Sequence, residues 1–459
     1  MYQIDFNRPT FIYFVGIGGI SMSGLAEILL DAGFQVAGSD RKASAITETL
    51  EKKGVKVFYG QRAENIPANI DCAVFTSAIH EDNPEFIAIR EKNIPFLSRA
   101  QLLGQIMQNY EMPIAVSGTH GKTTTTSMIS DILLQAGCDP TLSIGGILKS
   151  IGGNIRVGKS GLFVTEACEY TNSFLRFFPR IGIILNIEAD HLDFFKDLAD
   201  IRRSFRKFAE LLPPDGVLII NGEIPLYQEI TEGLSCRVIV YGTGSEHGYQ
   251  AENIHHDELA HPFFTLTAPD GSVREFTIKV PGEHNISNAL AAIVLADYLG
   301  IDSIHVKNAL ADFTGTDRRF EYKGMVGGVT IIDDYAHHPT EITATLQAAK
   351  NYPHNTIWCV FQPHTYSRTK AFLTEFAQAL SLAGQVVLTD IYAAREINTY
   401  GISSQDLAAA ISSLGCQCCY FPTFDEVENY LLENCTNGDL LITMGAGDVN
   451  KIGEKLLGN

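Results

Sequence analysis

A stretch in the middle of the chain has the residue types that hold nucleoside triphosphates. Residues 114–116 are an apolar run that predicts a buried strand, and Gly118-Thr-His-Gly-Lys-Thr123 follows it before a helical pattern that extends to Gln135. A glycine loop between a strand and a helix directs backbone N–H groups at phosphate, and a lysine adds positive charge. The loop departs from the ordinary pattern because Val116 stands six residues before the lysine, where a glycine is expected. We therefore predict ATP binding by Gly118, Thr119, His120, Gly121, Lys122, Thr123 and Thr124, with Lys122 solvated in the free protein and a threonine hydroxyl available to Mg²⁺.

A second glycine loop lies near the N-terminus. Residues 11–15 read as a strand, and the loop after it contains Gly16, Gly18, Gly19 and Ser21. The next strand ends at Asp40, a position from which a carboxylate usually reaches a ribose hydroxyl. Ser21 replaces the third glycine of the dinucleotide fingerprint. The loop alone therefore leaves its ligand open.

Acidic residues and a histidine follow two further strands. Glu166 closes the predicted strand 162–165, and Asp190-His191 comes after the predicted strand 181–185. Ligands bind parallel sheets at the carboxyl ends of their strands, and Mg²⁺ prefers a few carboxylates together with phosphate oxygens. These residues are candidate Mg²⁺ ligands. For Asp190-His191 a helix cap with a surface histidine is the alternative.

Amide and guanidinium groups appear farther along the chain. Asn285 and Asn288 lie on one face of a predicted helix, where they can bind a purine edge or cap the helix. Arg318 and Arg319 stand at a junction between two blocks of the chain. They can clamp a transferred phosphoryl group when domains close, or they form a solvated basic pair.

Two segments of the last third combine histidines with charged residues. Asp333, Asp334, His337 and His338 follow the predicted strand 329–332, and His364 and Arg368 follow the strand 356–361. A zinc site made of these histidines is disfavoured, because their spacing matches no metalloprotease pattern. The fork of Arg368 is suited to binding a carboxylate in a bidentate manner, and the two histidines His338 and His364 are candidates for hydrogen bonds to the same substrate.

The elements that must position these residues alternate between strands and helices, which predicts an α/β protein with mostly parallel sheets. We divide its 459 residues into three blocks, 1–109, 110–316 and 317–459. The net charge of −19 argues against general binding to nucleic acid or to anionic membranes. No long apolar run predicts membrane insertion. Nine scattered cysteines favour reduced thiols and a cytoplasmic location.

The motifs, in this order, resemble those of the Mur ligases of peptidoglycan synthesis. The resemblance rests on GIGGISMSG, GTHGKTTTT, NIEADHLD, GEHNISNALAA, GTDRRFE, DDYAHHPTE, FQPHTYSR and MGAGD. It implies a Rossmann-like N-terminal domain, a central phosphate-loop ATPase domain and a Rossmann-like C-terminal domain. The GIGG loop and the DDYAHHP segment are most similar to the members that join L-alanine to UDP-N-acetylmuramate, with ATP and Mg²⁺ and as a monomer or homodimer.

The resemblance also implies roles for particular residues. The catalytic set is Lys122, Glu166, His191, Arg319 and Asp334, with Thr123, Glu166 and His191 as metal ligands. Asn285, Asn288 and Arg319 contact the nucleotide, and the substrates contact Gly16, Gly18, Gly19, Ser21, Asp40, His338, His364 and Arg368. Some sibling ligases use a carbamylated lysine, which has no assignable position here.

Three alternative functions stay open at this point. A recycling ligase that joins the same UDP-sugar to a tripeptide shares much of the pattern. The first glycine loop and Asp40 suggest a dinucleotide-dependent dehydrogenase. A third alternative is an ATP-binding regulator without catalytic activity.

Overall fold

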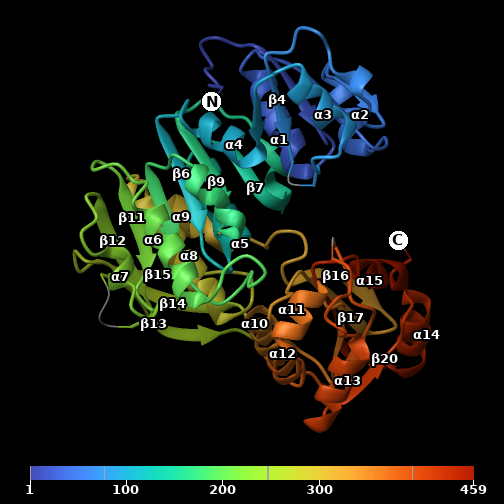
Figure 1. Cartoon of the computed structure of the whole chain (residues 1–459). Coiled ribbons are helices and arrows are strands. Elements are labelled where there is room, and N and C mark those ends of the chain that lie inside the picture. Colours follow the sequence, from blue (N-terminus) through green and yellow to red (C-terminus); the bar gives the residue numbers. More distant parts are fainter. Residues whose placement is uncertain (1, 77, 245–247, 395, 459) are drawn as a thin grey trace.

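The computed structural model describes residues 2–76, 78–244, 248–394 and 396–458 and shows three α/β parts, the central one between the other two (Figure 1). The N-terminal part has a five-stranded parallel sheet in the order β3-β2-β1-β4-β5. Its strands are β1 (Phe11–Val15), β2 (Gln35–Asp40), β3 (Lys56–Tyr59), β4 (Cys72–Phe75) and β5 (Phe96–Ser98), and its helices are α1 (Ile20–Asp31), α2 (Ala45–Lys52), α3 (Pro84–Glu91) and α4 (Arg99–Met107).

The central part is built on a ten-stranded sheet in the order β15-β14-β13-β12-β11-β10-β6-β9-β7-β8. The phosphate-loop strand β6 (Met112–Ser117) lies inside it, between β9 (Leu162–Ala167) and β10 (Ile181–Ile184). The remaining strands are β7 (Thr141–Leu148), β8 (Gly153–Arg156), β11 (Val217–Asn221), β12 (Arg237–Gly242), β13 (Tyr249–His256), β14 (Pro262–Thr267) and β15 (Val273–Thr277). The helices are α5 (Lys122–Gln135), α6 (Leu198–Ala209), α7 (Gln228–Thr231), α8 (Glu283–Tyr298) and α9 (Ser303–Asp312).

The C-terminal part has a six-stranded sheet in the order β16-β17-β21-β18-β19-β20, parallel except for the edge strand β16. Its strands are β16 (Glu321–Val326), β17 (Val329–Asp334), β18 (Ile357–Phe361), β19 (Gln385–Leu388), β20 (Gln417–Tyr420) and β21 (Leu440–Met444). Its helices are α10 (Pro339–Lys350), α11 (Tyr366–Ala371), α12 (Leu373–Leu380), α13 (Ser404–Ser413), α14 (Phe424–Asn434) and α15 (Asn450–Leu456).

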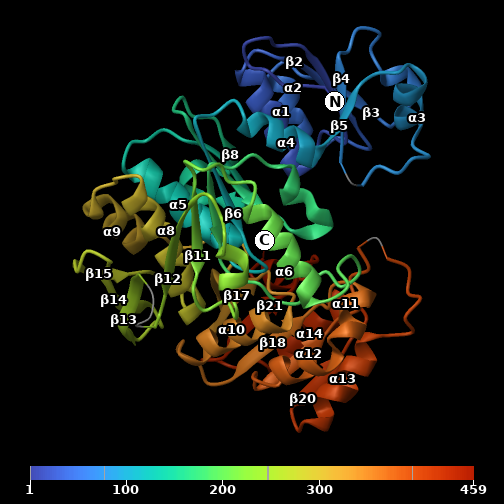
Figure 2. The same cartoon turned by 60° about the vertical axis from the view of Figure 1, so that its left-hand side comes forward.

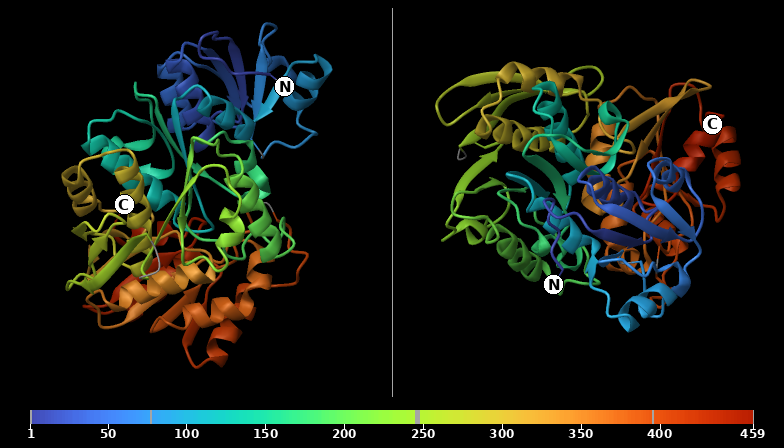
Figure 3. Two further views of the ribbon diagram at one scale, coloured as in Figure 1. Left: turned by 90° about the vertical axis from the view of Figure 1, so that its left-hand side faces the viewer. Right: turned by 90° about the horizontal axis from the view of Figure 1, so that it is seen from above.

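The N-terminal and central parts share one apolar core. A single cluster of buried side chains extends from α1 and α4 to β9, α6 and the short helix Tyr170–Arg176. Two helical glycines allow the close approach: a Cβ at Gly24 would overlap Ile155, and one at Gly104 would overlap the Arg176 carbonyl. Figure 2 and the left view of Figure 3 show this pair of parts above the C-terminal part. This junction is therefore a rigid one.

The predicted strands agree with the structure because they are local apolar runs. The predictions for 11–15, 385–388 and 440–444 coincide with β1, β19 and β21. The antiparallel hairpins β7–β8 and β13–β14–β15 were not predicted. Among the described residues, no helix is long and apolar enough to cross a membrane.

Candidate active site

The phosphate loop connects β6 to α5, and its backbone requires two glycines. Gly118 has φ +146° and Gly121 has φ +81°, values that L side chains rarely adopt. A Cβ at Gly121 would also overlap Oδ1 of Asn288 on α8. The side chain of Asn186 holds the loop from the other side, because its Oδ1 accepts the His120 N–H at 2.8 Å. The loop is thus fixed before any ligand arrives.

Lys122 is buried and paired, which corrects the expectation of a solvated lysine. Its side chain is 16% exposed, and Nζ lies 3.0 Å from Oε2 of Glu169, which is 2% exposed. Nζ also donates to the Thr119 carbonyl at 3.1 Å and to the Gly118 carbonyl. Burial alone would lower the pKa of Lys122, but the Glu169 carboxylate outweighs it and raises the pKa. The lysine is therefore fully charged at the loop.

Glu166 and Thr123 form a pair of oxygen donors at the start of α5. The Thr123 hydroxyl donates to Oε2 of Glu166 at 3.1 Å, and the Gly145 N–H donates to Oε1 at 2.6 Å. An oxygen pair beside a phosphate loop matches what Mg²⁺ prefers. The donor set therefore fits this ion.

Among the described residues, His191 contacts Glu169 and Asp190 and is not in contact with Thr123 or Glu166. Its Nε2 is 4.0 Å from Oε1 of Glu169 and 3.7 Å from Oδ2 of Asp190, and its ring stacks on Tyr170 at 4.4 Å. Burial lowers the pKa of His191, although the Asp190 carboxylate acts in the opposite direction. The residue has φ +53° and lies outside every helix, so the helix-cap alternative is wrong.

A cavity of about 150 Å³ lies between the central and C-terminal parts, next to the phosphate loop. Asn285 and Asn288 line it and bind each other, since Nδ2 of Asn288 donates to Oδ1 of Asn285 at 3.0 Å. Helix α8 is capped by Gly282, so neither asparagine is a cap. Other residues that line the cavity are His120, Gly121, Thr124, Glu188, Arg319, Asp334 and Glu341.

The two adjacent arginines have different surroundings. Arg318 is bound inside the C-terminal part by Asp333 at 2.9 Å and by the carbonyls of Gly445 and Gly447. Arg319 reaches the cavity, with its guanidinium 3.8 Å from Oε1 of Glu341. The two arginines therefore do not form a solvated basic pair. Of the two, only Arg319 faces the cavity.

Asp334 holds the turn that carries Arg319. Its carboxylate accepts the backbone N–H groups of Phe320 at 2.8 Å and Ala336 at 2.7 Å. Burial raises the pKa of Asp334 to about 6, although the positive charge of Arg319 opposes the rise. Its direct contacts are thus to backbone, and it borders the cavity from the C-terminal side.

Polar contacts join the C-terminal part to the central part. Arg368 binds Oδ1 of Asp190 through Nε at 3.3 Å and Nη2 at 3.1 Å. Nδ1 of His364 lies 3.3 Å from Nη1 of the same arginine, and burial lowers the pKa of His364 to about 4. Nε2 of His338 lies 3.1 Å from the Ala189 carbonyl. The structure therefore brings these three predicted substrate residues to the Asp190-His191 segment.

The first glycine loop forms a separate group in the N-terminal part. The Gly18 N–H donates to Oδ2 of Asp40 at 2.8 Å, so the aspartate already covers one loop amide. Gly19 caps α1, and Gly16 begins the loop with φ +84°. The hydroxyl of Ser21 accepts from Nη1 of Arg99 at 3.0 Å.

Sequence reasoning gave no role to Arg99, Glu169, Glu188 or Glu341. Glu169 pairs with Lys122, and Glu341 contacts His120 at 3.2 Å and His337 at 3.2 Å. The signal for Glu169 was its place just beyond β9, the strand that carries Glu166. Arg99 gave no comparable signal, because its position at the start of α4 reads as an ordinary helix terminus.

Comparison with known proteins adds independent evidence. The chain matches three family descriptions: "Mur ligase family, catalytic domain" over residues 11–111, "Mur ligase middle domain" over 116–296 and "Mur ligase, glutamate ligase domain" over 318–447. It is 60% identical to a UDP-N-acetylmuramate–L-alanine ligase of Agathobacter rectalis and 57% identical to one of Lachnospira eligens, each match covering 100% of both chains.

Solved structures with this arrangement are also known. The UDP-N-acetylmuramate–alanine ligase of Thermotoga maritima is 30% identical, with a TM-score of 0.82 and 98% of both chains covered. A murein peptide ligase of Psychrobacter arcticus is 25% identical, with a TM-score of 0.71 and 98% of both chains covered.

Proposed function

This chain belongs to the Mur ligase family, and from that membership we propose that it joins L-alanine to the lactyl carboxylate of UDP-N-acetylmuramate with the conversion of ATP to ADP and phosphate. The observation that carries the proposal is the meeting of three groups at one interface. These are the phosphate loop with Lys122, the oxygen pair of Thr123 and Glu166, and the C-terminal cations Arg319 and Arg368. The dehydrogenase and the ATP-binding regulator do not account for this combination.

The chemistry follows from the low reactivity of a carboxylate toward an amine. Transfer of the γ-phosphoryl group of ATP to the lactyl carboxylate gives an acyl phosphate, and ADP leaves. The amine of L-alanine then attacks the carbonyl carbon and phosphate departs. Lys122 and Arg319 stabilise the charge on the transferred group, and the enclosed interface keeps water from the acyl phosphate.

We assign Mg²⁺ to Thr123 and Glu166, and we propose His191, which lies beside Glu169 and Asp190, as a further ligand. When bound there, the ion supplies positive charge to the phosphate oxygens. The protein's own part is to hold the two oxygen donors, which it does through the Gly145 N–H and the start of α5. Asn285 and Asn288 line the adjoining cavity on the nucleotide side.

We assign the UDP-sugar to the first glycine loop, with Gly16, Gly18, Gly19, Ser21 and Asp40 as its contacts. Backbone N–H groups at the start of α1 suit a diphosphate, and Arg99 at Ser21 supplies a cation beside them. We propose domain limits of 1–109, 110–316 and 317–459, each of which encloses one of the three sheets. The free thiols of all nine cysteines favour a reducing, cytoplasmic compartment.

An ADP-release assay tests the reaction. The purified chain receives ATP, Mg²⁺ and UDP-N-acetylmuramate, and free L-alanine is compared with L-alanyl-γ-D-glutamyl peptides as the acceptor. We expect ADP release with L-alanine and the ligated product by mass spectrometry. Turnover with the peptide and none with L-alanine would assign the chain to the recycling reaction instead.

A substitution at Arg368 tests its assignment to the L-alanine carboxylate. Nε and Nη2 are held by Asp190, which leaves Nη1 beside His364 for a ligand. The bidentate binding expected from the sequence is thus already used for Asp190. Arg368→Lys keeps the charge, but a single ammonium group cannot hold Asp190 and present a second nitrogen to a ligand in this geometry, so we expect the KM for L-alanine to rise on the order of tenfold or more, with the KM for ATP nearly unchanged. An unchanged KM for L-alanine would assign its carboxylate to another cation.

A further inference from the structure

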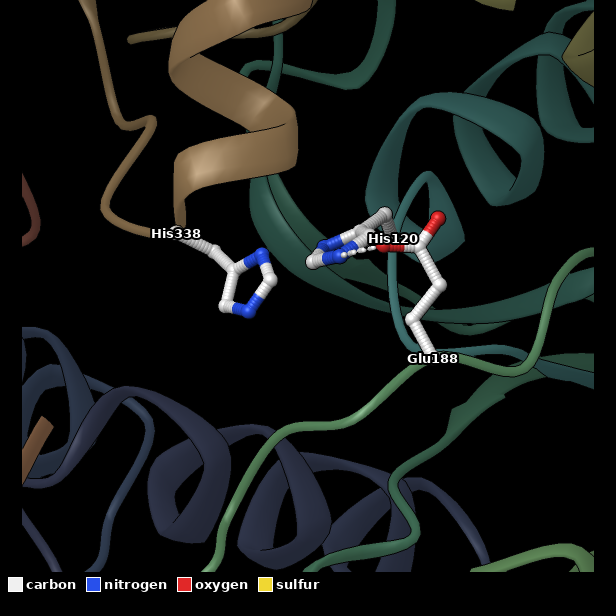
Figure 4. Close-up of side chains that lie close together, drawn as sticks. All are labelled: His120, Glu188 and His338. Carbon is white, nitrogen blue, oxygen red and sulfur yellow. Dashed lines mark ion pairs between the residues drawn. The ribbon is translucent and has the colours of Figure 1, made fainter. Parts of the chain in front are cut away.

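Two histidines and a glutamate from distant segments meet beside the phosphate loop. His120 belongs to the loop, Glu188 follows β10, and His338 precedes α10 in the C-terminal part (Figure 4). Their ligand atoms all lie within 4.8 Å of one another. None of the three residues belongs to the Thr123–Glu166 pair assigned to Mg²⁺, whereas His120 and Glu188 also line the cavity beside the phosphate loop, so the cluster borders the nucleotide cavity.

We propose that His120, Glu188 and His338 form a second metal site, selective for Zn²⁺ or a similar borderline ion, that bridges the central and C-terminal parts. Two imidazoles and one carboxylate are a recognised ligand set for zinc, with the fourth position open. Mg²⁺ prefers oxygen ligands and is not expected to compete well for two imidazole nitrogens.

The distances are compatible with such a site. Tetrahedral ligands at about 2.0–2.1 Å from zinc are about 3.3 Å apart. Nε2 of His120 and Oε2 of Glu188 are already 3.5 Å apart. Nε2 of His120 is also buried without a hydrogen-bond partner among the described residues. The ligand atom of His338 lies within 4.8 Å of the other two, and its approach to the ion would complete the set.

The groups around the cluster define which atom of each residue can bind the ion. Nδ1 of His120 is 3.2 Å from Oε1 of Glu341, which leaves Nε2 as the ligand atom. Nε2 of His338 is 3.1 Å from the Ala189 carbonyl, so Nδ1 is its ligand atom. This Nδ1 accepts the Thr340 N–H at 3.4 Å as the cap of α10, a long hydrogen bond that a metal bond would replace. Oε2 of Glu188 accepts from the Thr340 hydroxyl at 2.7 Å. A carboxylate or carbonyl behind each imidazole is the usual outer support of a metal site.

The site has a consequence for domain motion. Two ligands come from the central part and the third from the C-terminal part, so a bound ion links the two parts directly. Opening of the interface, which substrate entry and product release require, then needs the loss of one metal bond. We therefore expect Zn²⁺ to slow turnover while Mg²⁺ is present in excess.

Metal binding by the full chain tests the proposal without use of its activity. The protein is stripped with a chelator and titrated with Zn²⁺ in millimolar Mg²⁺, with isothermal calorimetry as the readout, and with Co²⁺ for its visible absorption. We expect one tight site per chain and a Co²⁺ spectrum of four-coordinate intensity. His338→Gln and Glu188→Gln should each weaken Zn²⁺ binding at least about tenfold, and His255→Gln, which removes an exposed histidine of β13, should leave it unchanged.

The two substitutions also separate binding from folding. Glu188→Gln keeps the shape of the side chain and an acceptor for the Thr340 hydroxyl, so it serves if His338→Gln disturbs the start of α10. Thermal unfolding of both variants without metal reports their folding. Equal Zn²⁺ affinity in the wild type and the three variants would overturn the proposal. So would Zn²⁺ binding by the wild type that is no tighter than binding to a single exposed histidine such as His255.

Discussion

At the scale of single residues, the site is a set of buried charges that are already paired. Lys122 is paired with Glu169, Arg368 with Asp190, and Glu341 with both His120 and Arg319. A buried ion pair contributes little to stability as a whole, but loss of one partner leaves a charge that burial penalises. Substitutions at these residues are therefore expected to affect folding as well as catalysis, and the two effects need separate measurements.

Lys122 offers the clearest separation. Lys122→Ala leaves the carboxylate of Glu169 buried and unpaired, so we expect a loss of about 3–5 kcal/mol in the free energy of unfolding. Combination with Glu169→Gln should restore most of this stability. Ligation should stay about 10²–10³-fold slower in both proteins, because the charge on the transferred phosphoryl group is missing. Urea unfolding and ADP release measure the two quantities, and full turnover by the double variant would remove Lys122 from the chemistry.

Asp334 should give stability a pH dependence. Burial raises the pKa of its carboxyl to about 6 in the folded protein, whereas the unfolded value is about 3.9. The folded state therefore binds this proton more tightly, and its contribution to stability is present at low pH and lost as the pH rises through 6. Relative to Asp334→Asn, the wild type should lose about 1–1.5 kcal/mol between pH 5 and pH 7. Urea unfolding at both pH values checks this, with Asp215→Asn at an exposed carboxylate as the control. A constant difference between wild type and variant would contradict the prediction.

At the scale of elements, helix α5 lies between two glycines that both have left-handed φ values. The two glycines serve different purposes. Gly121 has φ +81° and Gly137, just after the helix, has φ +69°. A Cβ at Gly121 would overlap Asn288 of α8, whereas one at Gly137 would meet no atom of the described residues within 4 Å. The first glycine thus sets the spacing between the phosphate loop and α8, and the second only ends the helix.

This difference predicts unequal effects of the same change. Gly121→Ala and Gly137→Ala each place alanine in the left-handed region, at a cost of about 1–2 kcal/mol in stability. Only Gly121→Ala also displaces Asn288 toward the cavity, so we expect the Kd for ATP to rise about tenfold or more. Nucleotide binding by calorimetry, with Gly137→Ala as the matched control, measures the effect. Equal ATP affinity in the two variants would show that the loop and α8 move apart without consequence for the nucleotide.

At the scale of the whole molecule, the two junctions between the parts have different chemistry. The N-terminal and central parts share a continuous apolar core, whereas the contacts of the C-terminal part with the site are polar and charged. Polar interfaces between domains usually allow relative motion. The C-terminal part is therefore the one we expect to move when substrates enter.

Removal of two ion pairs across this interface should open the molecule. In Asp190→Asn/Glu341→Gln, the guanidinium of Arg368 loses Asp190 and the imidazole of His120 loses Glu341, and both side chains gain hydration when the interface opens. We expect a larger radius of gyration by small-angle X-ray scattering, and a smaller response to added ATP and Mg²⁺. Asp215→Asn removes an ion pair within the central part and should leave the radius unchanged. A double variant as compact as the wild type would show that other contacts close the interface.

The sequence by itself determined the features that depend only on residues close together in the chain. The strand, glycine loop and helix around Lys122 are contiguous, so their geometry follows from local apolar runs and from glycine's access to positive φ. The same holds for β1, β19 and β21, and for the family, which rests on contiguous motifs. Several of the residues predicted for the site also line the cavity, because the carboxyl ends of parallel strands meet at one edge.

Only the tertiary structure decided which of these residues are partners. Asp190 and Arg368 are 178 positions apart, and His338 reaches the Ala189 carbonyl over 149 positions. Lys122 became a buried ion pair instead of a solvated cation because the end of β9 places Glu169 against the phosphate loop. His120, Glu188 and His338 come from three segments in two domains, so no local spacing of histidines marks their cluster. Contacts between distant residues depend on how the domains pack. That packing, and no local pattern of residues, sets the burial and the charge of each side chain.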